Sequence, residues 1–271
     1  MLHDSRSARR GDSTLTMRHA DWLVPDWNVS GVGAFMTTRH GGVSAAPFDS
    51  MNLQHGGGDA PEAVDRNRAL LAAAAGATPV FLRQVHGARV VHVTAADARP
   101  GAATQAADAC IATEPGVACT IQVADCLPVL FAAPRGSAVG AAHGGWRGLA
   151  AGVLEGTVAA LCQAAGCAPH ELQAWLGACI GPTRFQVGAD VLAAFGVDPD
   201  DPGRGRFVPQ MPGRWLANLP LLARDRLVAA GVERIFGGGW CTVSDASRFF
   251  SFRRDRITGR MAATVWLEPT R

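Results

Sequence analysis

Short apolar runs constrain the fold of this chain more than any other feature. Each run has the length and the apolar character of a β-strand. Most of them fall in the first half of the chain, which we therefore predict to be rich in strands. The runs span residues 32–37, 89–94, 107–112, 117–123, 128–133 and 138–142.

Two stretches carry clear helix signals. The first spans residues 61–75, where Pro61 opens an acidic first turn and Gly76 follows the last alanine. The second is the alanine-rich stretch 149–165, which has apolar side chains at helical spacing and ends at Gly166. Both are predicted to be amphipathic helices.

The second half of the chain mixes helices, strands and one long irregular segment. Residues 197–213 are rich in Pro, Asp and Gly and predict a long loop or lid. Further helices are expected at residues 187–195 and 219–230, and further strands at 173–178 and 261–267.

The composition favours a single globular domain in the cytoplasm. The chain has 271 residues, 48% hydrophobic and 18% charged, and can bury a substantial core. It has neither a long uninterrupted apolar run nor the apolar N-terminal run of a secretory signal, so no membrane association is expected. Its seven cysteines fit reduced thiols better than a disulfide framework. Residues 1–20 are polar and predict a disordered leader before a catalytic domain at 21–271, with Met17 as a second candidate start.

The basic residues exclude several kinds of chemistry. All 25 are Arg, and the chain contains no Lys and no Tyr, so a Schiff-base lysine, a P-loop lysine and a tyrosine acid are impossible. The net charge of +2 is small and the arginines are scattered, so nucleic-acid binding is not expected. Arg253, Arg254 and Arg256 form a local cluster that could bind an anionic ligand or could be a solvated basic turn.

Three glycine- or proline-flanked segments each offer one metal-type ligand, and together they provide His86, Cys126 and His143. Two imidazole nitrogens and one thiolate are the donor set of a zinc ion that keeps a coordination position open for chemistry. The three residues lie far apart in the sequence, so only the tertiary fold can assemble them. Each also has a plainer interpretation, since a His before Gly can cap a turn and a Cys in an apolar run is usually a small core residue.

Eight motifs, in order from about Asp21 to Leu267, resemble those of the YfiH or laccase-domain family, which is also called polyphenol oxidase or peptidoglycan editing factor. They are TTRHGGVS (37–44), MNL (51–53), RQVH (83–86), ADACIAT (107–113), ADCLPVL (124–130), AHGGWRG (142–148), GACIGP (177–182) and FFSFRRD (249–255).

This resemblance implies an α/β fold, a single domain of mixed β-sheets flanked by helices that is similar to the catalytic core of cytotoxic necrotizing factor. It also implies a zinc-dependent enzyme that cleaves adenosine, inosine, guanosine or methylthioadenosine with phosphate and deaminates adenosine. The two histidines and one cysteine of the family correspond to His86, Cys126 and His143. Purine nucleosides and phosphate are thus the expected partners, a monomer is favoured, and copper could replace zinc in vitro.

Four further residues are candidates for supporting roles. Arg39, Arg147 and Arg253 could contact phosphate or the base, because phosphorolysis needs positive charge at the anion. A surface arginine paired with a carboxylate is the more common situation. Asp125, next to Cys126, could orient a ligand from the second coordination shell, or it could cap a turn.

Rival functions stay open at this point. A metal-free cysteine hydrolase would use Cys126 as nucleophile and His143 or His86 as base. A copper-dependent polyphenol oxidase is the older interpretation of the family, but the chain lacks the paired H-x-H ligands of four-copper oxidases. A non-catalytic protein, in which zinc only stabilises the fold and the protein acts on a cell-wall precursor, is the third alternative.

Overall fold

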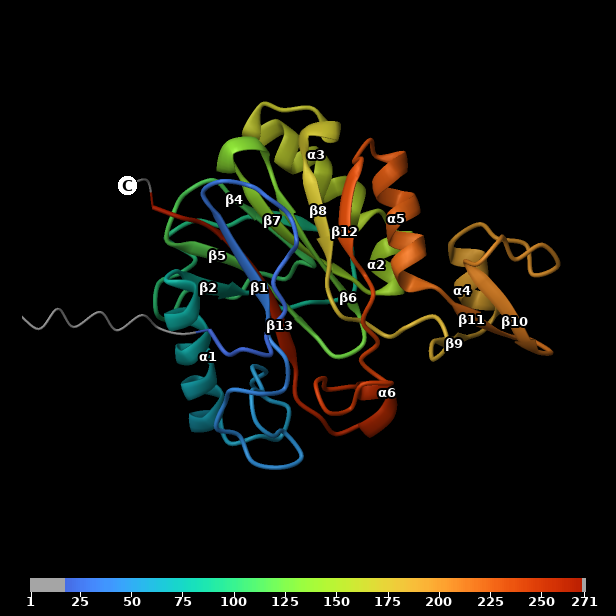
Figure 1. The fold of residues 1–271 in the computed structure, drawn as a ribbon, viewed down its shortest axis with the longest axis horizontal. Helices are drawn as coiled ribbons and strands as arrows, with labels where there is room; N and C mark the ends of the chain where they lie inside the picture. Colours follow the sequence, from blue (N-terminus) through green and yellow to red (C-terminus); the bar gives the residue numbers. More distant parts are fainter. Residues whose placement is uncertain (1–17, 270–271) are drawn as a thin grey trace, which may run out of the picture.

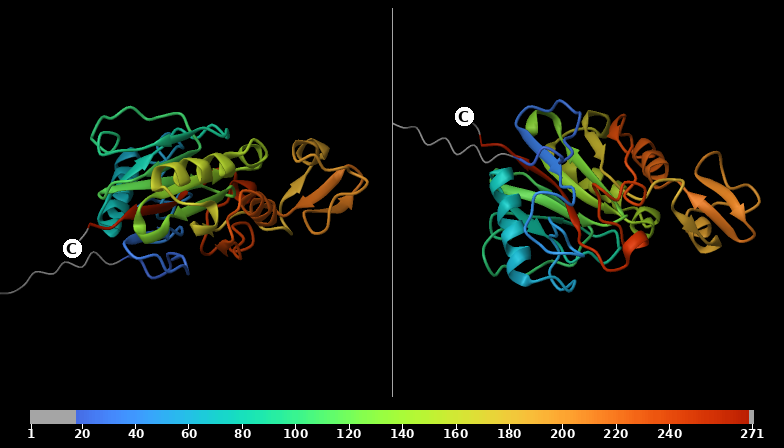
Figure 2. Two further views of the ribbon diagram at one scale, coloured as in Figure 1. Left: turned by 90° about the horizontal axis from the view of Figure 1, so that it is seen from above. Right: turned by 60° about the horizontal axis from the view of Figure 1, so that its bottom comes forward.

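A computed structural model of the chain describes residues 18–269. Two β-sheets lie face to face at its centre and helices cover the outer face of each, giving layers in the order helix, sheet, sheet, helices (Figure 1). A third, smaller sheet projects from one side (Figure 2). Met17 and nearly all of the predicted leader lie outside the described residues, so both stay predictions.

The larger central sheet is mixed and deeply buried. Its strand order is β12-β8-β6-β7-β4-β3, and the pairs β12–β8 and β3–β4 are parallel while the others are antiparallel. Strands β4, β6 and β7 are buried on both faces, which explains why they read as continuous apolar runs. The strands are β3 (Val90–His92), β4 (Ala109–Ala112), β6 (Leu127–Ala132), β7 (Val139–Gly144), β8 (Gln173–Leu176) and β12 (Arg234–Gly237).

The second central sheet packs on the first and has the order β1-β13-β5-β2, with only β2–β5 parallel. Met36 and Ile121 from this sheet and Leu130 and Trp175 from the larger sheet belong to one buried cluster between the two. The strands are β1 (Val32–Met36), β2 (Thr78–Phe81), β5 (Val117–Val123) and β13 (Met261–Leu267).

Helices close the two outer faces. Helix α1 (Pro61–Ala75) covers the outer face of the smaller central sheet through Leu71. Its bounds are the predicted ones. On the other side, α2 (Trp146–Ala150), α3 (Val153–Ala165) and α5 (Leu219–Ala229) pack on the larger sheet. The prediction of one helix over 149–165 is wrong at its start, because Gly152 adopts a left-handed φ of 88° and separates α2 from α3.

The projecting part contains β9 (Gln186–Val187), α4 (Ala189–Ala194), β10 (Phe207–Met211) and β11 (Arg214–Ala217), and its strands form an antiparallel sheet of order β10-β11-β9. The prediction of a loop over 197–213 is wrong where β10 forms. All side chains of β10 after Phe207 are exposed, so the strand shows no alternation of apolar and polar residues.

The predicted class, a single α/β domain of mixed sheets flanked by helices, is confirmed. Similarity to cytotoxic necrotizing factor stays a prediction. Strands β2, β9, β11 and β12 were not predicted, and the remaining short elements are α6 (Phe252–Asp255) and 3-10 turns at Pro134–Gly136 and Pro169–Glu171. Over residues 18–269, no helix has both the length and the apolar character needed to cross a membrane.

Candidate metal centre and cavity

His86 lies in the connection from β2 to β3, where the chain passes from the smaller central sheet to the larger. Its backbone φ of 61° is left-handed, a conformation that few non-glycine residues adopt. The amide of His86 donates to Asp108 Oδ1 at 2.8 Å, and the amides of Val85 and Gly87 donate to Asp108 Oδ2 at 3.1 and 2.7 Å. One buried carboxylate thus fixes the turn that carries His86.

Cys126 lies in the second connection between the same two sheets, from β5 to β6. It is half-buried, and its side chain lines a cavity. The preceding residue, Asp125, has a φ of 93°, so the chain turns sharply as it leaves β5. The prediction that Cys126 lies between two strands is confirmed.

His143 lies inside β7, one residue from its end, and not after the strand as predicted. Its side chain is only 3% exposed. Gly145 follows the strand, and a Cβ at Gly145 would stand 3.1 Å from His86 Cδ2 and 3.3 Å from Cys126 Sγ. The absence of a side chain at Gly145 therefore gives the three residues room to meet.

The fold brings His86, Cys126 and His143 together. One ligand atom from each lies within 4.8 Å of the others, and within residues 18–269 this is the group of three that could hold a metal ion. Cys126 Sγ is 3.8 Å from His86 Nε2, and the two imidazole rings have centroids 4.7 Å apart. This close grouping of two imidazoles and one thiol suits a zinc ion with one position open toward the cavity.

Asp108 is the functional residue that sequence reasoning missed. It is fully buried, its Oδ1 accepts a hydrogen bond from His143 Nδ1 at 2.9 Å, and its backbone carbonyl accepts from the His143 amide at 2.7 Å. A carboxylate that holds one imidazole nitrogen leaves the other free for a metal, with a fixed tautomer. In the sequence, Asp108 is marked only as a lone acidic residue just before an apolar strand, inside the ADACIAT motif (107–113).

Charges in the cluster stabilise one another. Burial alone would raise the pKa of the Cys126 thiol, but hydrogen bonds from His143 and His86 lower it to about 6. Burial alone would lower the pKa of His143, but hydrogen bonds to Asp108 and Cys126 raise it to about 9. Burial opposes the charge of Asp108 too, yet its bonds from His143, Gly87 and Val85 keep the pKa of that carboxyl below its ordinary value. A thiolate is therefore favoured near neutral pH.

Asp125 contacts none of the three ligand side chains. Its Oδ1 accepts from Thr242 Oγ1 at 2.6 Å, its Oδ2 accepts from the Arg253 amide at 2.6 Å, and its carbonyl accepts from the Ile180 amide at 2.9 Å. These bonds tie the backbone next to Cys126 to two other loops. The carboxylate that reaches a ligand side chain is Asp108.

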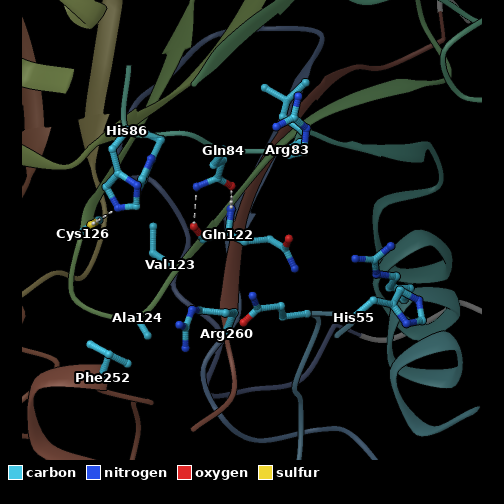
Figure 3. A pocket seen from close by; sticks show the side chains of 14 residues that line it. His55, Arg83, Gln84, His86, Gln122, Val123, Ala124, Cys126, Phe252 and Arg260 are labelled. Atoms are coloured by element: carbon cyan, nitrogen blue, oxygen red, sulfur yellow. Dashed lines mark hydrogen bonds between the residues drawn. The ribbon is translucent and has the colours of Figure 1, made fainter. Parts of the chain in front are cut away.

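The ligands stand at one end of a cavity of about 550 Å³. Figure 3 shows His86 and Cys126 on one side of the view and His55 on the other, with a hydrogen-bonded pair, Gln84 and Gln122, between them. The lining residues are Gln54, His55, Arg68, Leu82, Arg83, Gln84, His86, Gln122, Val123, Ala124, Cys126, His143, Phe252 and Arg260.

Three arginines in this cavity have no acidic partner. Arg68, Arg83 and Arg260 form no ion pair within residues 18–269. Arg68 Nε donates a hydrogen bond to the Leu53 carbonyl at 2.9 Å, and Arg68 Cζ lies 3.9 Å from the centroid of the Phe81 ring. Burial lowers the pKa of the Arg68 and Arg260 guanidinium groups, although an arginine in a protein keeps its charge. Among residues 18–269 no carboxylate pairs with these three arginines, so apart from the Cys126 thiol the ionisable groups of the cavity lining are basic.

The arginines singled out from the sequence lie outside this cavity. Arg39 donates to the Asp49 carbonyl at 2.9 Å and to its carboxylate at 3.1 Å, so its charge is already paired. Arg147 stacks on Trp146, with its Cζ 4.3 Å from the ring centroid. Arg253 lines a separate hollow.

Comparisons with known proteins agree along nearly the whole chain. The family model described as multi-copper polyphenol oxidoreductase laccase matches residues 33–268. A purine nucleoside phosphorylase of Pseudomonas aeruginosa is 50% identical over 91% of this chain and 98% of its own length. The purine nucleoside phosphorylase YfiH of Escherichia coli is 46% identical over 90% of this chain and 98% of its own length.

Solved structures show the same fold. A protein of Neisseria meningitidis superimposes with a TM-score of 0.84 at 43% identity, covering 92% of this chain and all of its own. YlmD from Geobacillus stearothermophilus gives a TM-score of 0.85 at 33% identity, covering 93% of this chain and 98% of its own.

Proposed function

This chain belongs to the multi-copper polyphenol oxidoreductase laccase family, and on that premise we propose that it is a metal-dependent purine nucleoside phosphorylase. The observation that carries the proposal is one cavity with a His–Cys–His ligand group at its end and, in its walls, three arginines that form no ion pair within residues 18–269. Relatives named purine nucleoside phosphorylase, 44 to 50% identical to this chain, support the reaction.

Phosphorolysis requires a site that holds phosphate against the ribose carbon attached to the base. A phosphate oxygen forms a bond to that carbon, the bond from the carbon to the base nitrogen breaks, and the base leaves with the electron pair and gains a proton. Arg68, Arg83 and Arg260 are better placed to hold the phosphate than Arg39, Arg147 and Arg253, because only the first three line the cavity. Gln84 is held in place by the backbone of Gln122 and can contact the nucleoside.

A zinc ion would be held by His86, Cys126 and His143, with Asp108 fixing the orientation of His143. When bound, zinc would supply a Lewis acid at the end of the cavity where the substrate reacts. Copper can occupy the same ligands in vitro, because mixed nitrogen and sulfur sites bind it tightly. The ligands suffice for one ion, and the sequence has no H-x-H pair, so we do not propose a multi-copper oxidase.

Adenosine, inosine, guanosine and methylthioadenosine are the proposed substrates, and deamination of adenosine is the proposed second activity at the same ligands. Seven cysteines without a disulfide support a cytoplasmic enzyme, since reduced thiols persist in that compartment. A monomer stays a prediction.

The decisive experiment is product analysis of these nucleosides incubated with metal-analysed protein, with and without phosphate. Release of free base that depends on phosphate and is lost in His143→Ala supports the proposal. Arg39→Ala serves as the matched control among the arginines and should keep the activity. No change in any nucleoside with zinc-loaded protein would overturn the proposal and favour an editing factor acting on a cell-wall precursor.

One rival is supported by a specific observation. The lowered pKa of Cys126 and the raised pKa of His143 describe the thiolate and imidazolium of a metal-free cysteine hydrolase. Chelation separates the two mechanisms. Activity that survives complete removal of metal favours the hydrolase, whereas activity that disappears and returns with added zinc favours the phosphorylase.

A further inference from the structure

A second hollow also borders α6 (Phe252–Asp255). Its volume is about 450 Å³, and it is lined by Gln186, Val187, Gly188, Arg214, Arg253 and Arg256. Helix α6 contributes to both spaces, because Phe252 lines the metal cavity and the next residue, Arg253, lines this hollow. The hollow is therefore a neighbour of the proposed active site without being part of it.

Three arginines from different parts of the fold line this hollow. Arg214 comes from β11, Arg253 from α6 and Arg256 from the turn after α6. None of them forms an ion pair within residues 18–269. The nearby Asp255 is occupied by Arg254, at 2.7 Å, and Asp190, which lies close to Gly188, forms no ion pair with Arg214. A Cβ at Gly188 would stand 2.7 Å from Asp190 Oδ1 and 3.1 Å from Arg214 Nη1, so Asp190 offsets part of the charge of Arg214, and the three arginines still leave the hollow with a net positive charge.

Most hydrogen-bond donors of these arginines are unused. Arg253 donates one bond to the Gln186 carbonyl at 3.2 Å and stacks over Phe185. Within the described part of the chain, the side chains of Arg214 and Arg256 donate no hydrogen bond. Arg256 also has a left-handed φ of 62°, a strained backbone conformation of the kind that accumulates at functional sites.

We propose that this hollow binds an oligophosphate, that is, two or more linked phosphoryl groups. Guanidinium groups pair with phosphate oxygens through two parallel hydrogen bonds, and three of them match an anion that carries several charges along a chain. The volume admits a small anion or the phosphate chain of a nucleotide. The proposal does not depend on the reaction catalysed in the neighbouring cavity.

Calorimetric titration of the metal-free protein with sodium tripolyphosphate, at constant ionic strength, tests the proposal, because tripolyphosphate chelates zinc and would otherwise add the heat of metal removal. We expect one saturable site, and each of Arg214→Gln, Arg253→Gln and Arg256→Gln should weaken the affinity at least about tenfold, the value of one lost charged hydrogen bond. Arg234→Gln, an exposed arginine on β12, is the matched control and should keep the affinity.

Arg68→Ala distinguishes the hollow from the metal cavity, whose arginines also attract phosphate. If Arg68→Ala abolishes the binding and the three hollow variants do not, the anion binds in the metal cavity and the proposal is wrong. Equal affinity in all variants would overturn it as well. Competition between tripolyphosphate and a nucleoside triphosphate, with the plain nucleoside as control, then shows whether a free oligophosphate or a nucleotide is the natural source.

Thermal unfolding separates a role of Arg256 in anion binding from a role in stabilising the fold. Because the three charges repel one another, Arg256→Gln should leave the Tm unchanged or raise it when no anion is present. In the metal-free protein, tripolyphosphate should raise the Tm of the unmodified chain and raise that of the variant less at the same concentration. A variant that unfolds at a clearly lower temperature in the absence of anion would identify Arg256 as structural and contradict the proposal.

Discussion

Asp108 and Asp125 are two buried aspartates beside the same candidate metal centre, and they serve different purposes. Asp125 precedes Cys126 in the sequence, yet its carboxylate binds Thr242 and the backbone of Arg253. Asp108 is distant in the sequence from all three ligands, yet it contacts His143 and the turn of His86. The aspartate next to a ligand in the sequence therefore holds neighbouring loops in place. The aspartate that orients a ligand side chain is distant in the sequence and reaches His143 through the fold of the sheet.

The largest effect is expected for Asp108→Ala. The change leaves His143 Nδ1 and the three amides from Val85 to Gly87 without an acceptor, so we expect a loss of about 3–5 kcal/mol in the free energy of unfolding. Zinc affinity should fall by roughly 10–100-fold, the usual result of removing a carboxylate that supports a histidine ligand. Urea unfolding of the metal-free protein and zinc titration measure the two effects.

Asp125→Ala is the matched control for that comparison. It should cost stability as well, but we expect zinc affinity within about threefold of the unmodified protein, since no ligand side chain loses a partner. Equal losses of zinc affinity in the two variants would show that the comparison is wrong. If Asp108→Ala does not fold, Asp108→Asn provides the same test with a smaller perturbation.

Removal of the metal should come next in size. An ion present at 100 times its dissociation constant stabilises the folded state by about 2.7 kcal/mol, so chelation should lower the Tm of the unmodified protein. The Asp108→Ala variant should respond less, because it binds zinc more weakly. Calorimetric scans at several zinc concentrations measure both. A Tm that is independent of zinc in the unmodified protein would argue against a metal site.

Gly145→Ala should weaken zinc binding with little change in metal-free stability. The new methyl group would stand 3.1 Å from His86 Cδ2 and 3.3 Å from Cys126 Sγ, which crowds the ligands. The φ of −64° at Gly145 suits alanine, so the backbone itself is not strained. We expect about a tenfold loss of affinity, equivalent to one well-placed contact. Gly239→Ala, at a position with no atom within 4 Å, is the control and should bind zinc normally.

Asp125→Asn should have the smallest effect. An amide can still accept from the Arg253 backbone and donate to Thr242 Oγ1, so only the charge is lost, and the unfolding free energy should fall by about 1 kcal/mol. Zinc affinity should not change measurably. If the variant folds with this stability and yet loses its zinc, Asp125 supports the metal ligands, which contradicts the assignment of that role to Asp108.

The sequence predicted the elements with strong local signals. Helix α1 and strands β5 and β13 have the predicted bounds, because a proline and a glycine mark the ends of the helix and mostly apolar side chains run through the two strands. Strands β2 and β12 have four residues each, and their pairing depends on β5 and β8, which local sequence does not reveal. The break at Gly152 was also invisible, since a single glycine is tolerated inside many helices.

The candidate site was predictable only in part. The three ligands stood out because His and Cys beside glycine are distinctive and because the motifs resembled a known family. The cavity arginines did not stand out, since Arg68 is one of two arginines on α1 and Arg260 stands in an irregular segment just before β13. What distinguishes them is their place in one cavity wall with no ion pair among residues 18–269, and that property exists only in the folded chain.

The positions of His86 and Cys126 imply that a bound metal ion would also hold parts of the fold together. Both lie where the chain crosses from the smaller central sheet to the larger, and His143 belongs to a strand of the larger one. An ion bound by all three would link the two sheets at the point where the chain crosses between them. Any sliding of one sheet over the other would distort the coordination of the ion, so the site would hold the ion only while the two sheets stay aligned, and release of the ion would report loosening of the core before either sheet unfolds.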